Sequence, residues 1–392
     1  MVDLTLLTRV SGSIRAVNTA RVLATIREQG PISRSELIQH SGLSKATVSV
    51  IVADLLERDA VRETGKSQPS RGRSRILLEF NSAAMTVIGV QLADDHCQFV
   101  RTDLAGRIQN SHEITLDLTD ASKVPAALTR GIRKLTKRPG GTVLGVGIGV
   151  PGLVDETGRH VTVALSHDWH DVDLAEELEK SLGMPVTLAN RAKVAALGQL
   201  ASLANNSEPV RSEADGEGQP RSAQDLVYLY LGSGVVAGIA INGRLHFGHD
   251  GTAGDLGHVM VDPRGPQCTC GTHGCLQVLV GTSAIVADAE ADSWEQVVRD
   301  VREGSANALQ AVQRAGGHLG LPLAHMMAAV GPSVIAVGGP TAQLGTPLLE
   351  VIEAAIRQAA PTAGPVELVL ADDSAPPRGA AMLWLQRAGL LP

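Results

Sequence analysis

The pattern of apolar and polar positions changes near residue 80, and the two parts of the chain predict different architectures. Before that point, apolar residues recur at helical spacing in three short stretches, which Gly30-Pro31 and Gly42 separate. We therefore expect three helices: one from about Arg15 to Glu28, one from Ser33 to about His40, and a third that Ser44 caps. The third has a single apolar face formed by Val48, Ile51, Val52, Leu55 and Leu56.

These helices have the features of a winged helix-turn-helix domain over residues 1–80. Ser33-Arg34-Ser35-Glu36 has the spacing of a capping box, and the third helix starts with small, polar and basic residues after a glycine turn. Two extended runs, 60–64 and 75–80, flank a tip rich in Gly, Ser and Arg, as in a hairpin wing. The expected base or phosphate contacts are Ser44, Lys45, Thr47 and Ser49, and the expected minor-groove contacts are Arg71 and Arg73.

The charge distribution adds weak support for a nucleic-acid-binding head. Residues 1–80 contain 12 Lys and Arg residues against 8 Asp and Glu residues, whereas the whole chain contains 34 against 41. A basic head on an acidic body is consistent with a head that binds a polyanion. A three-helix protein-interaction domain with a solvated basic loop is the alternative.

From about residue 83 the chain alternates short apolar runs, amphipathic stretches and glycine turns, which predicts an α/β body over residues 83–392. Residues 205–224 contain hardly any apolar side chain, so we expect a disordered loop there. The chain has no run of 18 apolar residues, and its first residues lack the features of a signal peptide. These features predict a cytoplasmic protein, in which thiols stay reduced.

Three of the four cysteines lie within VDPRGPQCTCGTHGCLQ (261–277), and a disulfide, a reactive thiol and a metal site are the alternatives. A reducing compartment disfavours the disulfide. Cys268-x-Cys270-x4-Cys275, preceded by His258, offers three sulfur ligands and one nitrogen ligand, which suits tetrahedral Zn²⁺ in a closed structural site. His273 is an alternative ligand within the loop, and a set of free reduced thiols is the remaining alternative.

Head and body together resemble a transcriptional regulator of the ROK family (repressors, open reading frames and sugar kinases). The resemblance rests on GVPGLVD (149–155), LGSGVVAG (231–238) and AGDLGHVMVDPRGPQCTCGTHGCLQ (253–277), with SRSEL and GLSKATVS in the head. It implies an N-terminal winged helix-turn-helix followed by a two-lobed, actin-like (RNase H-like) sugar-kinase body. It also implies zinc binding by His258, Cys268, Cys270 and Cys275, and a sugar pocket that includes Asp255, His258 and Gln277.

Several positions depart from the pattern of the ROK sugar kinases. Gln91-Leu92-Ala93-Asp94-Asp95 stands where the kinases have a glycine-containing phosphate signature, and Val236 replaces a glycine of the second phosphate loop. The catalytic base of the kinases is the aspartate of an Asn-Asp pair. Here Arg191 follows Asn190, and an arginine cannot accept a proton from a sugar hydroxyl. We therefore expect no kinase activity.

The predicted function is a DNA-binding transcriptional regulator, a repressor of sugar or amino-sugar metabolism that acts as a homodimer or homotetramer on a palindromic operator. The predicted ligand-binding residues are Asn190, Arg191, Asp255, His258 and Gln277. Arg191 favours a phosphorylated or otherwise anionic sugar as effector. A neutral sugar, or a body that has lost its ligand, is the alternative. Three other functions compete: a sugar kinase with an appended head, a zinc-dependent enzyme and a protein-interaction scaffold.

Overall fold

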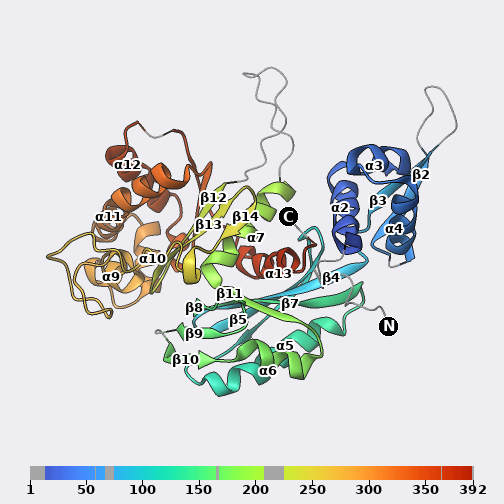
Figure 1. Ribbon diagram of the computed structural model, residues 1–392. Helices are drawn as coiled ribbons and strands as arrows, with labels where there is room; N and C mark the ends of the chain where they lie inside the picture. Colours follow the sequence, from blue (N-terminus) through green and yellow to red (C-terminus); the bar gives the residue numbers. More distant parts are fainter. Residues whose placement is uncertain are drawn as a thin grey trace. The chain divides into compact units, whose positions relative to one another are not determined.

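The computed structural model describes residues 14–57, 59–66, 75–164, 167–206, 225–362 and 364–390. The chain divides into two compact units, and each is considered by itself (Figure 1). The first unit comprises Met1–Ile148, Asp173–Leu188 and Ala380–Pro392, and the second comprises Gly149–Val172 and Ala189–Gly379. Most of the predicted loop 205–224 lies outside the described residues. Within the described part of the chain, no helix is long and apolar enough to cross a membrane.

The head forms three helices and a small antiparallel sheet, in the order α2 (Ile14–Gln29), β1 (Ile32–Ser33), α3 (Arg34–Ser41), α4 (Lys45–Glu57), β2 (Val61–Lys66) and β3 (Ile76–Phe80). The capping box predicted at the start of α3 is present: Ser33 accepts a hydrogen bond from the Glu36 backbone N–H, and the Glu36 carboxylate accepts one from the Ser33 backbone N–H. Gly42 ends α3 in the left-handed conformation, with φ of 66°. The strands pair in the order β1-β3-β2.

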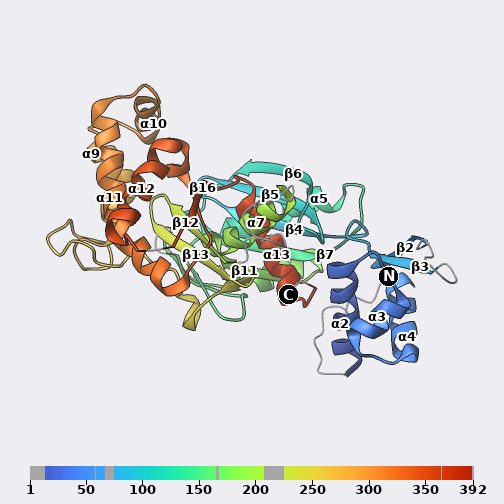
Figure 2. The ribbon, with the colours of Figure 1, turned by 90° about the horizontal axis from the view of Figure 1, so that it is seen from above.

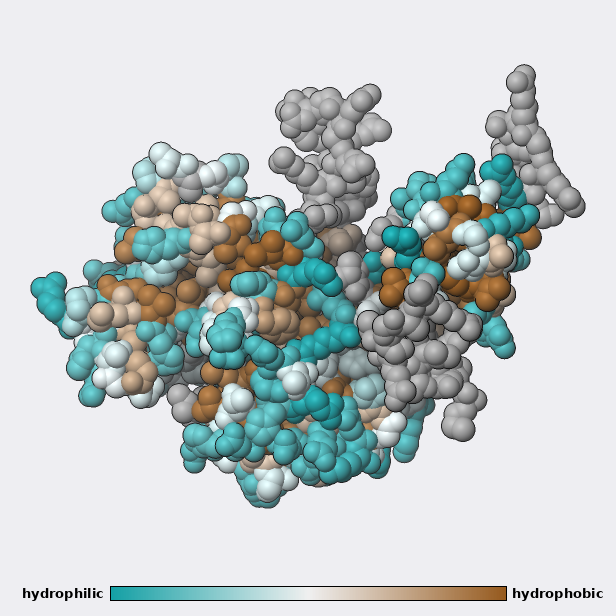
Figure 3. Space-filling model, viewed as in Figure 1, coloured by the Kyte–Doolittle hydropathy of each residue, from teal (hydrophilic) through white to brown (hydrophobic). Residues whose placement is uncertain are grey.

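The rest of the first unit is built on a five-stranded sheet of order β11-β7-β4-β5-β6. Its strands are β4 (Met85–Leu92), β5 (His96–Asp103), β6 (Ile108–Thr115), β7 (Thr142–Val150) and β11 (Val186–Asn190), and β4, β5 and β6 are antiparallel neighbours. The helices α5 (Val124–Thr136) and α6 (Leu174–Leu182) lie side by side on one face of this sheet (Figure 1). The outer surface of this layer is mostly hydrophilic (Figure 3), as expected for amphipathic helices that cover a sheet.

The head shares its hydrophobic core with the end of the chain. Buried side chains of the three head helices pack in one cluster with Trp384, Leu385 and Ala388, which belong to α13 (Ala375–Arg387) or follow it directly. The Arg27 guanidinium on α2 also donates a hydrogen bond of 2.9 Å to the Leu390 carbonyl. The C-terminal residues of the first unit are therefore part of the core that supports the head.

The second unit contains a sheet of order β14-β13-β12-β15-β16, in which β12, β15 and β16 are parallel and β12, β13 and β14 antiparallel neighbours. These strands are β12 (Leu226–Leu231), β13 (Val235–Ile241), β14 (Arg244–His246), β15 (Val334–Gly338) and β16 (Glu367–Leu370). A smaller sheet of order β10-β9-β8 is formed by β8 (Leu153–Val154), β9 (Val161–Ala164) and β10 (Trp169–Val172).

Helices complete the second unit. They are α7 (Arg191–Asn206), α8 (Leu276–Val280), α9 (Thr282–Asp288), α10 (Trp294–Arg302), α11 (Ala306–Val330) and α12 (Thr346–Ala359). The helices α9 to α12 gather at one end of the unit (Figure 2). There they enclose a core of Val, Leu, Ile, Ala and Met side chains together with β12, β13 and β15.

Helix α7 packs on α13 with the two backbones in direct contact. A Cβ atom at Gly198 would lie 1.8 Å from the Ala375 carbonyl oxygen, and one at Gly379 would lie 1.7 Å from the Val194 carbonyl oxygen. Real side chains do not tolerate such distances, so each helix needs a glycine at the crossing.

We expect Gly198→Ala to lower the free energy of unfolding by about 1–3 kcal/mol, because the added methyl group overpacks a backbone contact. Gly317→Ala is the matched control: Gly317 lies within α11, and a Cβ there would meet nothing within 4 Å. That control should be neutral or stabilising, because alanine is the better helix former. Urea unfolding of both variants measures the two free energies of unfolding. Equal changes in the two variants would contradict a close backbone contact between α7 and α13.

Candidate functional site

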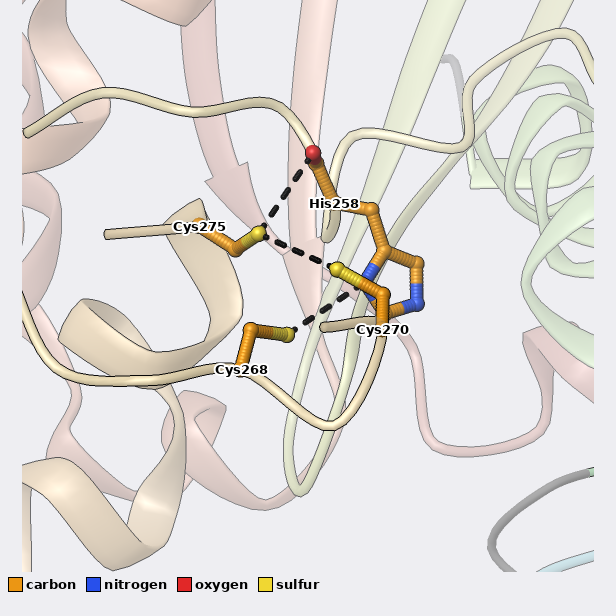
Figure 4. Close-up of side chains that lie close together, drawn as sticks. All are labelled: His258, Cys268, Cys270 and Cys275. Atoms are coloured by element: carbon orange, nitrogen blue, oxygen red, sulfur yellow. Dashed lines mark hydrogen bonds between the residues drawn. The ribbon is translucent and has the colours of Figure 1, made fainter. Parts of the chain in front are cut away.

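His258, Cys268, Cys270 and Cys275 come together in the second unit, and their ligand atoms all lie within 4.8 Å of one another. Cys268 and Cys270 lie in a turn, and Cys275 immediately precedes α8 (Figure 4). The turn is held by two isolated bridges, one of which pairs Met260 with Cys275. In Figure 4 the imidazole ring and the three thiol groups point toward a common centre.

Two distances within this group match those of tetrahedral zinc. The Cys270 and Cys275 sulfurs are 3.6 Å apart, and His258 Nδ1 is 3.5 Å from the Cys268 sulfur. Tetrahedral zinc with ordinary bond lengths requires about 3.8 Å between two sulfurs and about 3.6 Å between a sulfur and a nitrogen. His273, the alternative ligand, is exposed and is not among the clustered groups.

The surroundings lower the pKa of Cys268 and of Cys270 and so favour their thiolates, the metal-binding form of cysteine. At Cys275, a hydrogen bond with Thr272 is outweighed by burial and the neighbouring thiols, which raise the pKa. Hydrogen bonds from the Thr272 side chain and backbone lower the pKa of Cys270 to about 6. The Gln277 side-chain amide donates to the Cys268 sulfur over 3.5 Å. Gln277 therefore connects the cluster to the neighbouring cavity, which it also lines.

That cavity has a volume of about 470 Å³, and every described residue that lines it belongs to the second unit. All five predicted ligand-binding residues are among the lining residues, namely Asn190, Arg191, Asp255, His258 and Gln277. Pockets for small organic ligands typically have volumes of about 300–1,000 Å³. The cavity is therefore large enough for a monosaccharide with a substituent.

Asn190 lines the cavity, but its side-chain amide is engaged in hydrogen bonds with backbone groups. Its Nδ2 donates to the Gly152 carbonyl over 2.8 Å, and its Oδ1 accepts from the backbone N–H of Ala192 over 2.9 Å. Oδ1 is also 3.4 Å from the Lys193 backbone nitrogen. Asn190 thus caps the start of α7 and ties it to the loop before β8.

Arg191 is 8% exposed and stacks on an aromatic ring of the same unit. Its guanidinium carbon lies 4.8 Å from the centroid of the Tyr230 ring, within the range of a cation–π interaction. Sequence reasoning identified Arg191 but missed Tyr230, because nothing local indicates that a β12 side chain faces the start of α7.

Lys193, which also lines the cavity, was missed by the sequence analysis. Its side chain is 3% exposed, and burial lowers the pKa of the ammonium while the nearby Asp255 carboxylate raises it. The available signal was a lysine among the apolar residues of AKVAALG. Its burial depends on how α7 packs against β12 and β13, which the local sequence does not specify.

The segment that replaces the kinase phosphate signature ends β4 in the first unit. Gln91 and Leu92 are buried, and the Gln91 side-chain oxygen has no hydrogen-bond partner among the described residues. Asp94 and Asp95 are exposed in the turn that follows. Two carboxylates at such a turn would repel nucleotide phosphates.

In the head, the start of α4 forms an exposed surface. Ser44 accepts a hydrogen bond from the Thr47 backbone N–H over 3.1 Å and caps α4, and the two hydroxyl groups are 2.8 Å apart. Lys45 and Ser49 are exposed and belong to no buried cluster. Val50, which sequence reasoning did not identify, is 59% exposed on the same helix. The predicted wing residues Arg71 and Arg73 lie outside the described residues.

The fold and site define the chain as a sugar-kinase-like body that carries a winged helix-turn-helix domain. The ROK family model matches residues 87–387 and the MarR family model matches residues 17–67. This chain belongs to the ROK family, as its motifs predicted.

Three comparisons place it within that family. It is 28% identical over 335 residues to the xylose repressor of Bacillus subtilis, and the match covers 82% of each chain. A crystal structure of a ROK family transcriptional regulator, a homologue of the E. coli MLC protein, has a TM-score of 0.78 at 25% identity. That match covers 96% of this chain and 98% of the other.

A ROK family glucokinase from Streptomyces griseus, solved with glucose and AMPPNP, has a TM-score of 0.64 at 25% identity. That match covers 76% of this chain and 98% of the glucokinase chain. The predicted fold class, with a winged-helix domain before a sugar-kinase-like body, is confirmed.

Asn190→Ala should lower the free energy of unfolding by about 1–2 kcal/mol, because it removes the cap of α7 and its bond to the Gly152 carbonyl. The exposed Asn307 on α11 supplies the control, since Asn307→Ala alters no described side-chain hydrogen bond. Thermal unfolding followed by circular dichroism compares the two. A change no larger than that of the control would show that the cap contributes nothing.

Proposed function

We propose that this protein is a DNA-binding transcriptional regulator, a repressor of sugar or amino-sugar metabolism whose body binds a sugar or sugar-phosphate effector. The observation that carries the proposal is the combination of an exposed, capped α4 in a winged-helix domain with a ligand cavity in the body. The xylose repressor named above supports the same interpretation. We propose that the protein acts in the cytoplasm, the compartment that holds the DNA.

Lys45 and Ser49 of α4 supply the proposed phosphate and base contacts, together with Ser44 and Thr47. The exposed Val50 adds an apolar side chain of the kind that contacts thymine methyl groups in the major groove. Arg71 and Arg73 remain the proposed minor-groove contacts. One helix-turn-helix reads few base pairs, so we propose a homodimer or homotetramer on a palindromic site.

We further propose that the body catalyses no phosphoryl transfer. The kinase base is an aspartate that accepts a proton from the sugar hydroxyl, and Arg191 at the corresponding position has no acceptor atom. Arg191 is also fixed in place by its contact with Tyr230. ATP consumption by the purified chain with any sugar of a broad panel would contradict this part of the proposal.

The proposed cofactor is a structural zinc ion held by His258, Cys268, Cys270 and Cys275. Four protein ligands leave no coordination position for a reactive water, so the ion would stabilise the loop rather than take part in catalysis. His258 itself lines the cavity, and Cys268 accepts a hydrogen bond from the lining residue Gln277, so zinc would also fix one wall of the cavity.

The DNA-binding proposal is tested by capture of genomic fragments with the full-length chain at physiological salt. We expect enrichment of one palindromic site. Lys45→Ala should weaken binding to that site. It should also reduce the slope of log affinity against log salt concentration by about one, because one fewer counterion is released. Lys137→Ala, an exposed lysine outside the head, is the control and should bind as the wild type does. Failure of the wild-type chain to retain any DNA would leave the protein-interaction scaffold as the alternative.

Cys275→Ser should abolish stoichiometric zinc and lower the melting temperature, because the buried ligand is lost and structural zinc contributes folding energy. Cys97→Ala, at the buried cysteine of β5 in the first unit, should keep its zinc. Metal analysis by mass spectrometry measures both variants. Equal zinc content in the two would overturn the proposed ligand set.

A further inference from the structure

Lys193 is a buried cation for which the described part of the protein provides no hydrogen-bonding partner. Its side chain is 3% exposed and lines the cavity. No described residue accepts a hydrogen bond from its ammonium or forms an ion pair with it within 4.0 Å, although the Asp255 carboxylate is close enough to raise its pKa. Its ammonium nitrogen is not among the fully buried polar atoms without a partner, so it reaches the cavity, where water or a bound ligand must supply its acceptors.

A second unfavourable feature lies in the same turn. Arg191 and Lys193 both occupy the first turn of α7, which contains no acidic residue. The N-terminus of a helix carries a positive partial charge, so cations there are disfavoured and anions favoured. Two buried basic residues at this point make one side of the cavity strongly electropositive, and Asp255 is the only carboxylate among its described lining residues.

We propose that the cavity binds a monosaccharide derivative carrying an anionic group, and that Lys193 is the residue that recognises the anion, with Arg191 beside it. This inference rests on the proposed function, because it specifies the effector class of the same cavity. A phosphate monoester supplies several acceptor oxygens for the ammonium, and Asp255 remains for the sugar hydroxyls. A sugar carboxylate would offer the same chemistry with fewer acceptor oxygens.

The test uses the full-length chain and titration calorimetry with glucose, N-acetylglucosamine and xylose, their phosphate monoesters, the corresponding sugar acids, and inorganic phosphate. At least one phosphate monoester should bind at least tenfold more tightly than its neutral parent sugar and than inorganic phosphate. If a sugar acid binds more tightly than every phosphate ester, the anion is a carboxylate. Equal affinity for neutral and anionic sugars, or no binding by any compound, would overturn the inference.

Lys193→Met removes the charge and keeps an unbranched side chain that is one heavy atom shorter. It should weaken binding of the anionic ligand about 10- to 100-fold, as expected for a lost charge-assisted hydrogen bond, and should weaken binding of the neutral parent sugar by a much smaller factor. Lys193→Arg should restore part of the affinity. Without ligand, Lys193→Met should keep or raise the melting temperature, because it removes a charge that partial burial disfavours. A large fall would instead indicate a structural role for Lys193. Lys137→Gln is the surface control.

DNA retention by the same preparations separates the two proposals. If the chain retains an operator but binds no anionic sugar, the effector inference fails and the DNA-binding function stands. If it binds an anionic sugar but retains no DNA, the anion site stands and the regulator function fails.

Discussion

The crossing of α7 and α13 is the contact on which much of the structure depends. Gly198 and Gly379 let the two backbones touch, because a side chain at either position would overlap a carbonyl oxygen of the partner helix. A polar network beside the crossing fixes the register of the two helices. There the Arg378 guanidinium and the Ser202 hydroxyl both contact the Asp372 carboxylate. The Asp372 backbone N–H also donates to the Gln199 side chain over 2.9 Å.

Each helix of this crossing carries residues with a further role. Helix α7 begins with Arg191 and Lys193, so its position determines where the two cations enter the cavity of the second unit. Helix α13 continues into the first unit, where Trp384 packs against Gly145 so closely that a Cβ would overlap the indole. The same stretch of α13 contributes to the core of the winged-helix head. One continuous helix therefore takes part in the packing of both units.

Features determined by local sequence were predictable, and features determined by long-range packing were not. The capping box at Ser33, the apolar face of α4 and the close spacing of Cys268, Cys270 and Cys275 all depend on neighbours in the sequence. His258 was predicted as the fourth ligand from the zinc donor set and from the family resemblance. The burial of Lys193 depends on strands β12 and β13, more than thirty residues away, and no local pattern indicates it.

The start of α7 also explains how one fold supports different chemistry. An aspartate after Asn190, as in the ROK kinases, would be stabilised by the helix N-terminus and would be available to accept a proton. Arginine and lysine in the same turn are opposed by the helix dipole, by about 0.3–1 kcal/mol for an exposed cation and more when buried. The stacking of Arg191 on Tyr230 offsets part of that cost, but Lys193 has no comparable contact with a described residue. The proposed loss of kinase chemistry and the proposed anionic ligand therefore have one origin: Arg191 replaces a proton acceptor with a donor, and Lys193 adds a second cation in the same turn.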